Sequence, residues 1–221
     1  MNIVTTLDEK IAGRHLLSHP FYQRWSAGEL TMPELQEYAS EYYHYSAAFP
    51  TFLSAIHSGC SDISVRQEIL ENLIEEERGP ENHPELWLRF CEGLGMKREE
   101  VRSSHPSDET TAVIQTLRDI CRQDSHAGVA ALYAYESQIP AVSASKIEGL
   151  AKFYEMTDPR AISFFQVHME ADVEHSATTA QLVDQLCDTP EKKREAEAAV
   201  DSTLAALYRF LDQIPVPVMV N

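Results

Sequence analysis

Apolar residues recur at three- and four-residue spacing along most of the chain, a pattern typical of amphipathic helices. The clearest helix start is Thr31-Met-Pro-Glu34, which offers a capping residue, an early proline and a glutamate three residues on. Pro50 lies inside this helix, where we expect a bend. The helix presents one continuous apolar and aromatic face, made by Tyr38, Tyr42, Tyr45, Phe49, Leu53 and Ile56.

Similar patterns predict six further helices, over about residues 64–77, 84–94, from 108 onward, 126–154, 158–188 and 190–213. Gly79 and Pro80 should kink or end the first of these, and residues 102–108 form a loop from which Ser107 or Asp108 caps the next helix. The stretch 126–154 reads as one long helix bent near Pro140. We therefore predict an all-α fold, a single bundle of about seven or eight helices over residues 1–221.

Composition narrows the possible partners. The formal net charge is −17, and such a surface repels nucleic acid and anionic lipid. The first residues lack the apolar stretch of a signal peptide, and no apolar window has the length of a membrane span. We expect a cytoplasmic protein with no nucleic-acid or membrane partner.

The four cysteines do not form CxxC or CxxH pairs. A structural zinc site is therefore disfavoured. Their wide spacing is typical of buried thiols in a reducing compartment, and they are Cys60, Cys91, Cys121 and Cys187.

The strongest chemical signal is the segment that contains His168, Asp172 and His175. At about 100° per residue, Asp172 lies roughly 40° from His168, and His175 lies roughly 20° away on the other side. Two imidazoles and a carboxylate on one stripe suit a first-row transition metal. The alternative is a polar helix face with chance histidines.

Two weaker signals add to this stripe. Glu76 and His83 are seven residues apart, which on a regular helix places them within roughly 20° of each other, although the intervening Gly79-Pro80 argues against a regular helix. Glu136 follows an apolar stretch, and a buried carboxylate needs a cation or hydrogen-bond donors; an exposed end of that stretch is the alternative. Together these residues supply three carboxylates and three histidines, enough for two metal ions, and mixed nitrogen and oxygen ligation suits iron or manganese.

Four short motifs make the chain resemble the heme-oxygenase-like di-metal oxidases: Asn72-Leu-Ile-Glu-Glu76, Asn82-His83, Tyr135-Glu136 and His168-x3-Asp172-x2-His175. Within that family the chain resembles the branch of the chlamydial protein associating with death domains (CADD), whose bacterial members are often labelled as similar to pyrroloquinoline quinone synthase C (PqqC). The resemblance covers nearly the whole chain. It fills all six ligand positions, which are Glu76, His83, Glu136, His168, Asp172 and His175.

The resemblance implies a heme-oxygenase-like bundle, an Fe/Fe or Fe/Mn centre, O2 as co-substrate with a reductant, and a homodimer. It further implies synthesis of 4-aminobenzoate, a folate precursor, from one of the enzyme's own tyrosines, so that no separate organic substrate is needed. The matching residues are Tyr22 for the consumed tyrosine and Lys146 for the nitrogen donor. Tyr38 and Tyr135 match the neighbouring aromatic residues of the site.

The residues themselves allow a plainer interpretation of these positions. Lys146 near a metal ion would have a depressed pKa and a neutral, nucleophilic amine, but taken alone it is an ordinary surface lysine. The remaining aromatic residues of the first long helix, Tyr42, Tyr43, His44 and Tyr45, are expected to serve packing. Each site histidine should donate its second ring nitrogen to a carboxylate or carbonyl, with candidates Glu41, Glu75, Glu77 and Glu174.

Four other functions remain open from the sequence. A cofactorless PqqC-like oxidase of a quinone precursor and a TenA-like thiamin hydrolase share the fold; the first needs basic residues and the second a cysteine nucleophile. A heme oxygenase would need an axial histidine such as His15 or His19. A non-enzymatic helical interaction protein would need none of the six inward-facing ligands.

Overall fold

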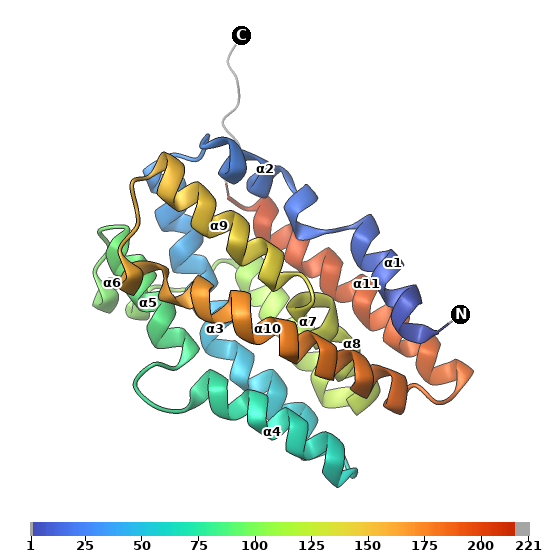
Figure 1. Cartoon of the computed structure of the whole chain (residues 1–221). Helices are drawn as coiled ribbons and strands as arrows, with labels where there is room; N and C mark the ends of the chain where they lie inside the picture. The colour runs from blue at the N-terminus through green and yellow to red at the C-terminus, as the bar shows by residue number, and fades with distance from the viewer. Residues whose placement is uncertain (1, 215–221) are drawn as a thin grey trace.

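The computed structural model describes residues 2–214, with the side chains of residues 170–173 left aside. Over this part of the chain all regular secondary structure elements are helices (Figure 1). The elements are α1 (Ile3–Gly13), η1 (Leu16–Ser18), α2 (Pro20–Ala27), α3 (Met32–Gly59), α4 (Ile63–Glu77), α5 (His83–Gly93), α6 (Arg98–Ser103), α7 (Asp108–Gln123), α8 (Ser125–Glu136), α9 (Ile139–Phe153), α10 (Pro159–Leu186) and α11 (Pro190–Asp212).

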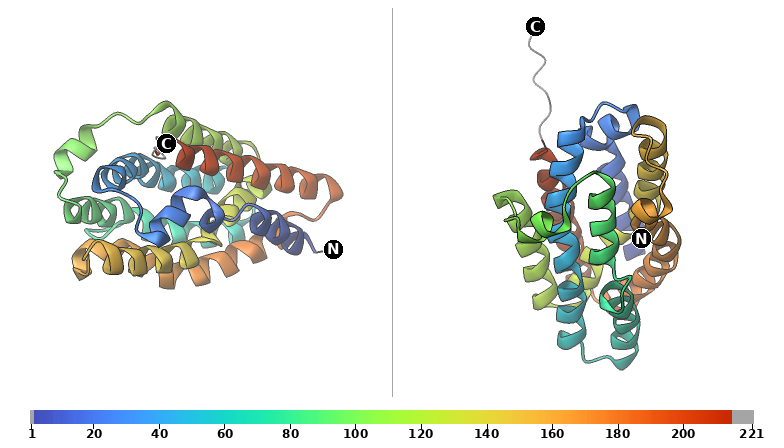
Figure 2. Two further views of the ribbon diagram at one scale, coloured as in Figure 1. Left: turned by 90° about the horizontal axis from the view of Figure 1, so that it is seen from above. Right: turned by 90° about the vertical axis from the view of Figure 1, so that its left-hand side faces the viewer.

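The helices form one bundle in which α3 and α10 are the longest members. Helix α10 packs against α5, α8 and α9, while α3 packs against α4, α5 and α7. The first helix lies beside α11, and α4 extends at one end of the molecule (Figures 1 and 2). The predicted all-α bundle is confirmed. None of the described helices combines the length and the apolar character needed to cross a lipid bilayer.

Capping signals predicted the helix starts well. Thr31 and Glu34 form the expected capping box, and Asp158 accepts a hydrogen bond from the backbone N–H of Arg160 at the start of α10. Ser107, not Asp108, caps α7. Helix α3 continues through Pro50 as far as Gly59.

Two expectations about the helices were wrong. The described residues form eleven α-helices, not seven or eight, because the short helices α1, α2 and α6 were not predicted; α6 includes Arg102 and Ser103, which were placed in a loop. The segment 126–154 is two helices, since Pro140 has no N–H and its ring would clash with the carbonyl of Glu136 if one helix continued. Gln138 stabilises the break, donating to the carbonyl of Ala134 at 2.6 Å and accepting from the backbone N–H of Leu16 at 2.7 Å.

Helix α8 is the centre of the bundle. Residues 126–136 are all buried, because α3, α7, α10 and α11 surround the helix. Its small residues allow this close packing: a Cβ atom on Gly128 would lie 2.7 Å from Ile56 Cγ1. Consequently the last residue of α8, Glu136, is carried into the interior of the protein.

Candidate metal centre and the adjoining lysine site

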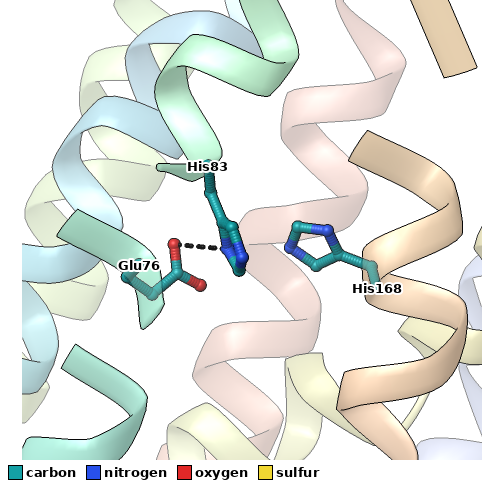
Figure 3. A group of neighbouring side chains, drawn as sticks. All are labelled: Glu76, His83 and His168. Atoms are coloured by element: carbon teal, nitrogen blue, oxygen red, sulfur yellow. Dashed lines mark ion pairs between the residues drawn. The ribbon is translucent and has the colours of Figure 1, made fainter. Parts of the chain in front are cut away.

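Three of the six predicted ligands meet inside the bundle. Glu76 at the end of α4, His83 at the start of α5 and His168 on α10 each offer a ligand atom, and these atoms all lie within 4.8 Å of one another. His83 stands between the other two, with its Nδ1 atom 2.8 Å from Oε2 of Glu76 (Figure 3). All three side chains are buried.

Glu76 and His83 converge for a different reason from the one their spacing suggested. On one regular helix they would be separated by about 10 Å along the axis. Instead α4 ends, and the chain turns at Gly79, whose φ is +86°, a conformation that favours glycine. Asn82 fixes the turn by donating to the carbonyl of Gly79 and by capping α5. The turn brings His83 back beside Glu76.

His168 is oriented by its own helix. Its Nδ1 atom lies 2.7 Å from the carbonyl oxygen of Phe164, and its ring stacks on the Phe164 ring. A proton on Nδ1 leaves Nε2 available to a metal, which is the carbonyl partnership expected for a site histidine. Burial, and then the neighbouring His83, lower the pKa of His168 well below its usual value, so the imidazole is neutral and able to bind a metal.

Glu136 is the fourth predicted ligand, and it faces the same region. It is 3% exposed, so the apolar stretch before it does not lead to an exposed end. Its two carboxylate oxygens accept hydrogen bonds from Asn72 Nδ2 at 2.8 Å and Thr179 Oγ1 at 2.9 Å. Glu136 lines a cavity of about 10 Å³ together with Glu76 and His168.

His175, a further predicted ligand, is not part of this triad in the described structure. Nε2 of His175 lies 3.1 Å from Oε2 of Glu75, and both residues line a surface pocket of about 300 Å³ between α4 and α10. Asn72 and Thr179 line the same pocket, so it adjoins Glu136. The side chain of Asp172 lies outside the described residues.

The convergent residues fit a transition-metal ion. One carboxylate oxygen and two imidazole nitrogens suit iron or manganese, and burying this set without a cation would be costly. All four cysteines are free and buried, as expected. Burial, reinforced by Glu136, raises the pKa of Cys121 to about 12, so this thiol is protonated at neutral pH.

A buried lysine forms the second part of the candidate site. Lys146 is 3% exposed, so the interpretation as a surface lysine was wrong. Its Nζ atom donates to the hydroxyl of Tyr38 at 2.6 Å, and the Tyr38 hydroxyl is 3.4 Å from that of Tyr22. Six aromatic rings lie 4.9–5.8 Å from Nζ: those of Tyr22, Trp25, Tyr38, Tyr42, Trp87 and Phe165.

This aromatic environment changes the protonation equilibrium of Lys146. Burial lowers its pKa to about 7, because the aromatic cage replaces water without supplying a carboxylate. A substantial fraction of the amine is therefore neutral at neutral pH. In contrast, burial raises the pKa of Tyr22 well above its usual value and keeps the phenol protonated.

Tyr42 and Tyr135 connect the two regions. Their hydroxyls are hydrogen-bonded to each other. Both residues line the cavity beside Glu76, Glu136 and His168, and both line a second cavity of about 20 Å³ beside Tyr22, Tyr38 and Lys146. The expectation that Tyr42 serves only packing was incomplete; its four-residue spacing from Tyr38 was the available signal.

The heme oxygenase interpretation is disfavoured by His19. Its Nε2 atom pairs with Asp212 at 3.0 Å, and its Nδ1 atom accepts the backbone N–H of Phe21. Both ring nitrogens are therefore engaged in structural contacts at the start of α2.

Sequence comparison now places these features in a family. Residues 36–208 match the sequence profile of a family described as iron-containing redox enzymes. The chain belongs to this family. It is 44% identical over 218 residues to a 4-aminobenzoate synthase from Nitrosomonas europaea, covering 94% of this chain and 89% of that protein. It is equally 44% identical over 214 residues to a 4-aminobenzoate synthase from Chlamydia trachomatis, covering 96% and 91%. A pyrroloquinoline-quinone synthase from Acinetobacter baumannii is 25% identical over 202 residues, covering 89% and 79%.

Solved structures confirm the fold of this iron-containing redox family member. A TenA homologue from Pseudomonas syringae superposes with a TM-score of 0.82 at 15% identity, covering 96% of this chain and 90% of that one. A CADD-like protein from Nostoc punctiforme gives 0.79 at 19%, covering 96% and 95%. A heme oxygenase-like domain from Shewanella denitrificans gives 0.78 at 20%, covering 96% and 88%. The predicted resemblance and the heme-oxygenase-like bundle are thus confirmed.

Proposed function

We propose that this protein is an O2-activating dimetal oxidoreductase that makes 4-aminobenzoate, with Tyr22 as the source of the ring and Lys146 as the source of the nitrogen. The supporting comparison is 44% identity, over nearly the whole chain, to proteins named 4-aminobenzoate synthase. The observation that carries the proposal is the buried Lys146–Tyr38–Tyr22 contact, separated from Glu76, Glu136 and His168 by the Tyr42–Tyr135 pair.

In this proposal Glu76, His83 and His168 hold one metal ion, and Glu136, Asp172 and His175 complete the site for a second. The pair is Fe/Fe or Fe/Mn, and it supplies electrons for the reduction of O2. His175 contacts Glu75 in the structure, so its place in the second site is part of the proposal.

The chain's own residues prepare the reactants. The aromatic cage excludes water from Lys146 and favours its neutral, nucleophilic amine. The Tyr38 hydroxyl contacts both the amine and the Tyr22 hydroxyl, so it holds the proposed nitrogen donor beside the proposed ring donor. The two interior cavities, about 10 and 20 Å³, each have room for about one water molecule. This favours an internal tyrosine over the large quinone precursor of a PqqC-like oxidase.

The proposal also includes an external reductant, a homodimeric assembly and a cytoplasmic location. Within it no separate organic substrate is required. Family membership among redox enzymes argues against a purely non-enzymatic interaction protein.

A single-turnover reaction tests the function. The protein is loaded anaerobically with Fe(II), alone or with Mn(II), and is then given O2 and a reductant. Mass spectrometry measures the 4-aminobenzoate formed and the mass of the peptide that contains Tyr22. We expect product from the wild type, with a modified Tyr22 peptide. Tyr22→Phe should keep the wild-type metal content and make no product. Normal product from Tyr22→Phe would remove Tyr22 from the proposed role.

A further inference from the structure

The hydroxyl of Tyr45 is a buried polar group without a hydrogen-bond partner. The residue is 2% exposed, and no hydrogen bond to its hydroxyl is present among the described residues. The other buried tyrosines of the described structure each use their hydroxyl in a hydrogen bond; they are Tyr22, Tyr38, Tyr42, Tyr133 and Tyr135. A buried hydroxyl left unpaired costs stability, so its presence needs a reason.

Tyr45 lines the cavity of about 10 Å³ beside the candidate metal centre. Glu76, Glu136 and His168 form its polar wall, and Phe49 and Phe164 contribute apolar surface. A cavity of this volume holds one water-sized molecule. A ligand there would therefore lie next to both the proposed metal ligands and the Tyr45 side chain.

The hydroxyl of Tyr45 can act as a hydrogen-bond donor, because a phenol keeps its proton at neutral pH. The nearby carboxylates have other contacts, Glu136 with Asn72 and Thr179, and Glu76 with His83.

We propose that Tyr45 donates a hydrogen bond to a diatomic ligand that reaches into this cavity from the adjoining metal site, which in the working enzyme is O2. Tyr45 is then a positioning residue, which orients the ligand and stabilises negative charge that develops on it during reduction. The inference rests on the proposed function to the extent that a metal ion must occupy the adjoining residues.

Nitric oxide is the probe for this hydrogen bond, because it is a diatomic ligand of Fe(II) that gives optical and vibrational signals. Fe(II)-loaded wild type, Tyr45→Phe and Tyr43→Phe are saturated with nitric oxide anaerobically, and its dissociation is followed in the presence of a scavenger. Tyr43 is the matched control, since it lies on the same helix but lines a surface pocket with Pro80 and Asn82. We expect dissociation to be about fivefold faster from Tyr45→Phe, the effect of losing one hydrogen bond, and unchanged from Tyr43→Phe.

Resonance Raman spectra provide the second measurement. The N–O stretching frequency of the wild-type complex should shift in D2O, and this shift should vanish in Tyr45→Phe. The metal-free Tyr45→Phe protein should also melt no lower than the wild type, because the substitution removes an unpaired buried hydroxyl and no contact that it makes.

Equal dissociation rates in all three proteins, or a wild-type spectrum insensitive to D2O, would overturn the inference. Loss of iron from Tyr45→Phe, or failure of the wild type to bind iron, would also overturn it, because Tyr45 would then not act on a ligand beside the metal. If the nitric oxide effects appear but no 4-aminobenzoate forms, the proposed function fails while the role of Tyr45 stands.

Discussion

Ionisable groups are buried to a similar depth on both sides of the Tyr42–Tyr135 pair. The two sides differ in the groups that surround the charge. On one side, Glu76 and Glu136 are buried among imidazoles and hydrogen-bond donors. On the other side, Lys146 is buried among aromatic rings and donates a hydrogen bond to the hydroxyl of Tyr38. The carboxylate side is suited to bind a cation, whereas the lysine side is suited to lose a proton.

The largest predicted effect is loss of metal binding on the carboxylate side. His168→Ala removes one of the three convergent ligand atoms, so we expect it to abolish metal binding at that position. Elemental analysis after loading with Fe(II) and desalting measures the effect. His15→Ala, at the partly buried N-cap of η1, is the control and should keep the wild-type metal content. Unchanged metal content in His168→Ala would remove the triad from the proposed centre.

The next prediction tests whether metal binding on the carboxylate side is independent of the lysine side. Lys146→Met should retain metal but make no 4-aminobenzoate, since it removes the proposed nitrogen donor without changing Glu76, His83 or His168. Lys152→Met is the matched control, because Lys152 is an exposed lysine on the same helix. Elemental analysis and product mass spectrometry on the same samples test this. Loss of metal from Lys146→Met would mean that the two sides are not independent, and full product from that variant would remove the lysine from the reaction.

The smallest effect is a pH dependence of stability, measured on metal-free protein. The folded pKa of Lys146, about 7, lies below the value of 10.5 for a free lysine, so the unfolded chain binds more protons between these limits. Wild-type stability should therefore rise relative to Lys146→Met as the pH increases from 7 towards 10.5, by at most about 5 kcal/mol. Urea unfolding at several pH values measures the difference between the two proteins. A constant difference would show that Lys146 is charged in the folded state.

The sequence predicted the helices that begin with strong capping signals, and it identified His168 correctly as an inward-facing residue with a carbonyl partner. It was less successful where the chain turns. Glu76 and His83 meet because α4 ends near Gly79, and periodicity cannot describe a turn. Likewise, the division between α8 and α9 depends on Pro140 together with the side-chain contacts of Gln138, which come from distant residues.

Burial was the other quantity that the sequence could not supply. Lys146 is buried because its cage comes from α2, α3, α5 and α10, and nothing in its local sequence distinguishes it from a surface lysine. Asn72 and Thr179 were not recognised as partners of Glu136 for the same reason. The resemblance to a family identified Lys146, and three-dimensional packing provides the physical explanation.

Helix α8 has a consequence for how this protein tolerates change. Residues 126–136 have no exposed face, and Gly128 has no room for even a methyl group beside Ile56. A mutational scan should therefore find α8 nearly invariant in size, even at positions far from any ligand. Helix α4 is more exposed, and its solvent-facing residues have space to vary. New variants of this protein are therefore more readily obtained on the exposed face of α4 than in the central helix.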